Sequence, residues 1–139
     1  MEDFVGVKVA LYFGNKLVVF LRDDKPGLRF ANMWDFPGGG REGAESPVEC
    51  AQREIEEEFG IKVASLAFTW TKEYPAMHEP NRRAYFMVAH LSREQFDAIQ
   101  FGDEGQRWQL MTPEEFLLRE DIVPYLRGRL GDYLEQGKG

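Results

Sequence analysis

Hydrophobic and polar positions along this chain follow strand-like patterns in some segments and helix-like patterns in others. Residues 5–13 and 17–22 are rich in β-branched and aromatic side chains, and Gly14-Asn15-Lys16 between them is typical of a hairpin turn. Further β-rich stretches predict strands at 61–73, 82–91 and 107–111.

The first helix has the clearest signals. Ser46 is suited to the N-cap, Pro47 to the first helical position, and Glu49 to the residue that completes a capping box. Gly60 provides a stop. These residues predict a helix at about 47–59.

Later helices are predicted by the same logic. Ser92 and Thr112 are each followed by capping residues, which indicates two short helices. The last helix is expected from an apolar stripe of Ile122, Leu126, Leu130 and Tyr133, with Asp121 as its N-cap. Strands before, between and after helices predict an α+β fold with a mixed sheet and helices on both faces.

The length and composition indicate one folding unit. The chain has 139 residues, 43% of them hydrophobic, which is enough for one core and short of two. No repeat, low-complexity segment or linker divides it, so we expect a single domain, 1–139, with polar tails at 1–3 and 136–139.

Charge and cysteine content exclude several classes of function. Seventeen Lys and Arg against 24 Asp and Glu give a net charge of −7, which disfavours binding to nucleic acid polymers or to anionic membranes. The lone Cys50 has no intrachain disulfide partner and reads as a small buried filler. No signal peptide or membrane span is recognisable, and we expect a soluble, cytoplasmic protein.

Three acids stand out on the predicted helix. Glu54, Glu57 and Glu58 fall within an arc of about 100°, and the apolar positions of the helix face elsewhere. Clustered carboxylates repel one another unless they are solvated or share a cation, and Mg²⁺ prefers such oxygen ligands. The spacing alone fits either a metal site or a solvated acidic face.

A longer pattern decides between them. Gly39, five residues, Glu45, seven residues and then Arg53-Glu54-Ile55-Glu56-Glu57-Glu58-Phe59-Gly60-Ile61 match the Nudix box at every defined position. The chain therefore resembles the Nudix hydrolases over residues 39–61. The preceding segment, 31–39, resembles MutT-type members, and Glu104-Gly105-Gln106 resembles the late loop that supplies these members with a further acid.

The resemblance implies an α/β/α sandwich that hydrolyses a nucleoside diphosphate linked to another group, using Mg²⁺ or Mn²⁺. By position in the motif, the implied metal ligands are Glu54, Glu57, Glu58 and the carbonyl of Gly38. Arg53 is expected to orient the carboxylates, and Glu45 to fix the junction of loop and helix. Glu56 points away from the acidic face and reads as a surface charge.

The general base stays open between two residues. Glu54 is favoured if the base acts from the helix, and Glu104 if a mobile loop closes over the metal.

Specificity is expected outside the box, because metals and phosphates are common to all such substrates. Arg22 is a candidate for a phosphate contact and equally an ordinary edge cation. Candidates for the base pocket are Asn32, Trp34, Phe36 and Trp70, with Asp121 as a reader of the purine edge. Buried aromatic residues at strand positions are, however, typical of a core.

The leading hypothesis is a MutT-like nucleoside triphosphate pyrophosphohydrolase acting on a small-molecule nucleotide, with oxidised purine nucleotides among its candidate substrates. The alternatives are a hydrolase of ADP-ribose, nucleotide sugars or dinucleoside polyphosphates, and a non-catalytic nucleotide sensor. Exposed sheet edges are compatible with a monomer or a homodimer.

Overall fold

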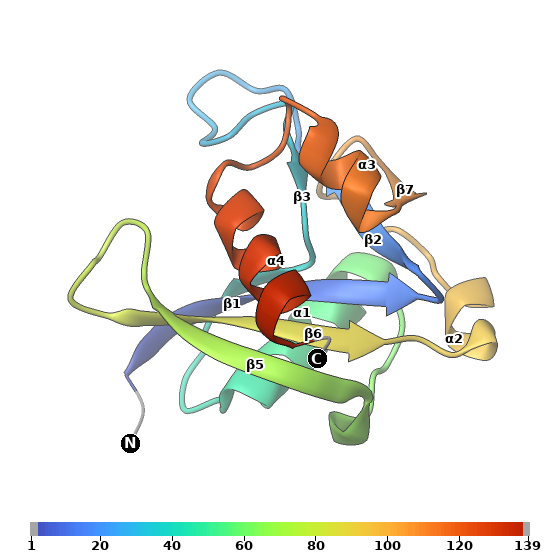
Figure 1. Ribbon diagram of the computed structural model, residues 1–139, viewed down its shortest axis with the longest axis horizontal. Helices are drawn as coiled ribbons and strands as arrows, with labels where there is room; N and C mark the ends of the chain where they lie inside the picture. Colours follow the sequence, from blue (N-terminus) through green and yellow to red (C-terminus); the bar gives the residue numbers. More distant parts are fainter. Residues whose placement is uncertain (1–2, 138–139) are drawn as a thin grey trace.

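A mixed sheet organises residues 3–137, the part of the chain that the computed structural model describes (Figure 1). Its strand order is β3-β2-β1-β6-β5, with β4 paired to β1 and β7 paired to β2. The strands are β1 (Phe4–Phe13), β2 (Lys16–Leu21), β3 (Trp34–Asp35), β4 (Gly38–Gly40), β5 (Phe68–Pro75), β6 (Arg83–His90) and β7 (Arg107–Met111). The helices are α1 (Pro47–Phe59), α2 (Arg93–Asp97), α3 (Pro113–Leu118) and α4 (Tyr125–Gln136), with a 3₁₀ helix η1 (Ser65–Ala67).

β1 is the strand around which the other parts are placed. It runs parallel to β6 on one side and antiparallel to β2 and β4 on the other. β2 pairs with β1 only near their shared turn, and the β3–β4 segment lies where these two strands have separated, with β3 on β2 and β4 on β1. This arrangement brings Gly38–Gly40 directly beside α1.

The two faces of the sheet carry two separate cores. Val7, Val9 and Leu11 point toward α1, whereas Ala10 and Tyr12 point toward α4, as expected from the two-residue period of a strand. Figure 1 shows α1 behind the sheet and α4 in front of it. The expected α+β fold with helices on both faces is therefore confirmed.

The predicted boundaries of α1 are also confirmed. Ser46 Oγ accepts from Glu49 N at 3.2 Å, and Glu49 Oε1 accepts from Ser46 N at 2.9 Å, which is the expected capping box. Gly60 ends the helix in the left-handed conformation with φ 71°. The capping box fixes the first end, and the backbone N–H of Gly60 donates to Glu56 O at the other, so local residues determine both ends.

Two predicted elements differ in the structure. The strand expected at 61–73 begins only at Phe68, because Ile61 and Val63 are buried in the α1-side core without pairing in the sheet. Asp121 is not the N-cap of the last helix, since Pro124 occupies that position and the Asp121 carboxylate accepts from Arg119 instead.

The ends of the chain differ partly from the expected tails. Asp3 accepts a hydrogen bond from Arg82 at 2.8 Å, and α4 continues to Gln136. Residues 1–2 and 138–139 of those tails lie outside the described residues. No helix within 3–137 combines the length and apolar character that crossing a bilayer would need.

Gly38 is expected to tolerate no side chain. A Cβ there would lie 2.2 Å from the carbonyl oxygen of Val7, and its φ of 142° is unfavourable for other residues. Gly38→Ala should lower the free energy of unfolding by at least about 3 kcal/mol in urea titrations. Gly128→Ala, in open space on α4, should instead raise it by about 0.5–1 kcal/mol. A Gly38→Ala protein as stable as wild type would contradict this account.

Candidate active site

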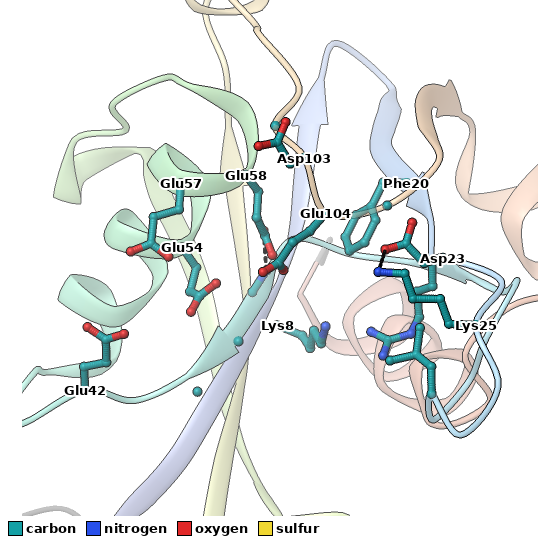
Figure 2. Close-up of a pocket in the computed structure, with 17 residues that line it drawn as sticks. Lys8, Phe20, Asp23, Lys25, Glu42, Glu54, Glu57, Glu58, Asp103 and Glu104 are labelled. Carbon is teal, nitrogen blue, oxygen red and sulfur yellow. Dashed lines mark hydrogen bonds and ion pairs between the residues drawn. The ribbon is translucent and has the colours of Figure 1, made fainter.

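The acidic face of α1 lines a cavity of about 840 Å³ between the helix, β4 and the loop before β7 (Figure 2). Glu54, Glu57 and Glu58 project into it from the helix, and Glu104 faces them from the loop. Among the described residues its lining holds seven acidic side chains against the basic Lys8, Arg22 and Lys25. We call this space the acidic cavity.

Arg53 connects the acids of this region. Its guanidinium binds Glu45 at 2.6 Å, Glu54 at 3.0 Å and Glu57 at 3.2 Å, and donates to the Gly40 carbonyl at 2.7 Å. These contacts hold the pKa of Arg53 above its usual value, mainly through the hydrogen bond to Glu45. The same hydrogen bond lowers the pKa of Glu45. Arg53 also pairs with Glu42 at 3.4 Å, so it contacts three carboxylates that line the cavity and joins them to β4.

β4 approaches the helix closely enough to contact its acids through the backbone. The amide of Gly38 donates to Glu58 Oε1 at 3.0 Å. A Cβ on Gly39 would lie 2.5 Å from the carboxyl carbon of Glu54. Glycine at these positions therefore makes room for the carboxylates beside the strand.

The loop that carries Glu104 is attached to both sides of the cavity. The amides of Gln100 and Gly102 donate to the carbonyls of Phe59 and Glu58 at 2.9 Å each, which satisfies acceptors that the end of a helix leaves free. On the other side, Gln106 N donates to Leu21 O at 2.8 Å. These bonds hold Glu104 over the acidic face (Figure 2).

Two carboxyl groups of the cavity are shifted toward their neutral form. Burial raises the pKa of Glu58 to about 8, although Lys8 and the Gly38 amide oppose the shift. Burial also raises the pKa of Glu54, against the effect of Arg53. A cation bound beside them would stabilise the ionised form of both carboxyl groups.

The donor chemistry of the cavity fits a hard divalent ion. Carboxylate oxygens are the ligands that Mg²⁺ prefers, and the gap left by Gly39 keeps the Glu54 carboxyl accessible. Among residues 3–137 no three His, Cys, Asp or Glu side chains already stand as a metal-binding group. Arg53 donates to Glu54 and Glu57, and the Gly38 amide donates to Glu58, so these bonds already hold the carboxylates that an ion would bind.

Two cations of the acidic cavity are held by a buried acid behind them. Asp35 is 1% exposed, and its Oδ2 accepts from Lys8 at 2.8 Å and from Arg22 at 3.0 Å. Burial lowers the pKa of Lys8, but Asp35 outweighs this and raises it above the usual value. Lys8 and Arg22 therefore present fixed positive charge opposite the carboxylates.

A second cavity of about 480 Å³ adjoins the first. The two share Lys8, Arg22, Gly39 and Gly40 as lining residues. The second is otherwise built from the start of β1, the loop after β5, Phe30 and the first turns of α4. We call it the head-group cavity.

Four of the residues proposed for substrate contact lie elsewhere. Trp34 is 1% exposed and belongs to the α4-side core, and Trp70 packs on Phe86 and Tyr133. Asn32 accepts from Gln106 at 2.9 Å, and Asp121 pairs with Arg119. None of these four residues lines either cavity, because each side chain is already engaged by core packing or by a hydrogen-bond partner. The fully buried Phe36 does not line them either.

Sequence reasoning missed Lys8, Phe30, Tyr125 and Arg129, which line the cavities. Lys8 could have been found from the sequence, because it is the one cation inside the apolar run of β1. Nothing local distinguishes the other three, since only the fold brings them together.

Two of the remaining sequence expectations agree with the structure. Glu56 is exposed and lies outside the lining of the acidic cavity. Cys50 is fully buried in the α1-side core, and burial raises the pKa of its thiol to about 12, which suits an unreactive filler.

Comparison with known proteins gives a consistent result. The family model described as NUDIX domain matches residues 4–129. An 8-oxo-dGTP diphosphatase of Proteus vulgaris is 31% identical over 78 residues, covering 55% of this chain and 68% of that protein. The m7GpppN-mRNA hydrolase NUDT17 of Xenopus laevis is 32% identical over 77 residues, covering 52% of this chain but only 26% of that protein.

Solved structures show the same fold at low sequence identity. A MutT protein from Methanosarcina mazei Go1 superposes with a TM-score of 0.74 at 18% identity, covering 99% of this chain and 98% of that one. An Ap4A hydrolase of C. elegans superposes with a TM-score of 0.71 at 18% identity, covering 96% and 98%.

The raised pKa of Glu58 predicts an unusual pH dependence of stability. Because this carboxyl binds its proton more tightly in the folded chain, the metal-free protein should lose stability as pH rises from about 4.5 to about 8. Mg²⁺ should reverse the loss above pH 8, where Glu58 is ionised. Thermal unfolding between pH 5 and 9 with and without Mg²⁺ tests this, and Glu58→Gln should flatten the profile. An unchanged slope in Glu58→Gln would refute the assignment.

Proposed function

Because this chain belongs to the Nudix hydrolase family, we propose that it is a nucleoside triphosphate pyrophosphohydrolase that uses Mg²⁺ or Mn²⁺. Water attacks a phosphorus of the triphosphate, a P–O bond of the anhydride breaks, and nucleoside monophosphate and pyrophosphate leave. One observation carries the proposal. The acidic cavity adjoins a second cavity of about 480 Å³, and Lys8 and Arg22 line both.

The residues that would hold the ion are Glu54, Glu57 and Glu58, with the Gly38 carbonyl as a further ligand. When bound, the ion neutralises phosphate charge and lowers the pKa of water. Arg53 pairs with Glu54 and Glu57 and restricts the rotation of their side chains. The conformational entropy of these carboxylates is therefore already reduced before substrate binds.

Lys8 and Arg22 suit the phosphate chain. Both line the two cavities, and Asp35 holds each at hydrogen-bond distance, so their positive charges are already in place. Preorganised cations stabilise negative charge that develops on transferring phosphoryl groups.

The proton of the attacking water goes to Glu54 or to Glu104. Glu54 is the more buried candidate, and burial raises its pKa, which makes its carboxylate a stronger base. Glu104 faces the same cavity from a loop attached to α1 and β2.

Similarity to the diphosphatase of Proteus vulgaris supports oxidised purine nucleotides as candidate substrates. The proposed partner is thus a small nucleotide, bound by one chain or by each subunit of a homodimer.

A product assay tests the proposal. The purified protein is incubated with Mg²⁺ and nucleoside triphosphates, 8-oxo-dGTP, ADP-ribose, nucleotide sugars or dinucleoside polyphosphates, and the products are separated by chromatography. We expect monophosphate and pyrophosphate from a triphosphate. Cleavage of linked diphosphates alone would replace the substrate assignment and keep the metal site. Binding without turnover on any compound would contradict hydrolysis.

Glu57→Gln should keep the fold and lower kcat by at least about 100-fold, because it removes one charged ligand from the metal site. Glu56→Gln is the matched control, since this exposed neighbour faces away from the cavity, and its kcat should stay within about twofold of wild type. Steady-state kinetics at saturating Mg²⁺ measures both. Equal losses in the two variants would contradict the assignment of faces on α1.

A further inference from the structure

Arg129 is a buried cation without an acidic partner. It lies on α4, is 7% exposed and lines the head-group cavity. Its guanidinium carbon lies over two aromatic rings, 4.7 Å from the centroid of Tyr74 and 4.6 Å from that of Tyr125. Within residues 3–137 it donates one hydrogen bond, to Pro75 O at 3.2 Å, and forms no ion pair with a carboxylate.

The remaining donors of this group are costly to leave unused. A guanidinium carries five N–H donors and stays charged, and burying a charge is unfavourable unless it is paired or hydrogen-bonded. The tyrosine rings supply cation–π attraction, but their faces offer no acceptor in the plane of the guanidinium. The free donors therefore call for acceptor atoms from a ligand in the cavity.

The surroundings of Arg129 suit a flat ring. Phe30 and Tyr125 lie on the same wall with their ring centroids 6.0 Å apart, and Tyr85 and Ala84 of β6 contribute further to the lining. Phe30 takes a positive φ of 56°, which is rare for a bulky residue outside functional sites. Aromatic walls of this kind bind a nucleobase by stacking.

We propose that Arg129 determines specificity by donating hydrogen bonds to the 6-oxo edge of a purine base in the head-group cavity. The protein then favours oxopurine nucleotides over adenine nucleotides. The inference rests on the proposed function, because the phosphates must lie in the acidic cavity for the base to reach Arg129 past Lys8 and Arg22, which line both cavities.

The preference follows from the donor-only character of the guanidinium. Guanine and hypoxanthine present O6 as an acceptor at this edge, and an arginine fork pairs well with such an edge. Adenine presents an amino group at the same position, so two donors would face each other in a buried site.

ITP and ATP form the sharpest test, because they differ only at this edge of the base. Wild type should hydrolyse ITP with a kcat/KM at least about 10-fold above that for ATP. Arg129→Met keeps apolar bulk over the tyrosine rings and removes the donors. It should lose at least about 10-fold for ITP, stay within about twofold for ATP, and so abolish the preference.

Arg127→Met is the matched control. Arg127 is exposed on the same helix, donates to the carbonyls of Leu117 and Arg119, and does not line the head-group cavity. Its ITP to ATP ratio should equal that of wild type.

Thermal unfolding separates this role from a structural one. Since Arg129→Met removes a buried charge without an acidic partner, its Tm should equal or exceed that of wild type. A lower Tm with an unchanged ITP to ATP ratio would overturn the proposal in favour of a structural arginine. Equal losses for ITP and ATP would also overturn it, because the contact would then be to the shared ribose or phosphates.

Failure of the proposed function is recognised separately. Calorimetric binding of ITP and ATP to the Glu57→Gln variant measures the base preference without turnover. An ITP preference there, with no hydrolysis by wild type, would reject the function and keep the role of Arg129. Hydrolysis by wild type with equal rates for ITP and ATP would keep the proposed function and reject the role of Arg129.

Discussion

The contact of the Arg53 guanidinium with four glutamates is the interaction on which the site depends. Glu42, Glu45, Glu54 and Glu57 would repel one another on one side of a helix and its preceding loop, and a single fixed cation between them offsets that repulsion. The same group also holds the Gly40 carbonyl. The acids, the loop and the strand are thereby kept in one arrangement.

Close approach of backbone to helix is the second constraint. β4 lies between separated parts of the β1–β2 hairpin, and its glycines come within contact distance of the α1 carboxylates. A longer side chain at Gly38 or Gly39 would overlap with β1 or with Glu54. The composition of this segment is thus set by the space between a sheet and a helix, as well as by any ligand.

The parts of the molecule that could be predicted from the sequence are those determined locally. The ends of α1 follow from its own capping residues, and its acidic face follows from helical periodicity. The head-group cavity could not be predicted, because Phe30, Tyr125 and Arg129 meet only through tertiary packing. Trp34 illustrates the opposite error, since an aromatic residue beside a motif suggests a ligand contact, but here it fills the core.

The two cavities share only a small part of their walls, and this has a consequence for how such proteins diverge. The head-group cavity is formed largely by the loop after β5, Phe30 and the start of α4. Within residues 3–137, these segments include none of the hydrogen-bond and ion-pair partners of Arg53, which are Gly40, Glu42, Glu45, Cys50, Glu54 and Glu57. Substitutions there can accumulate over evolutionary time without disturbing the carboxylates on α1. Proteins that descend from one ancestral chain can therefore acquire new substrates while they keep the same carboxylate site on α1.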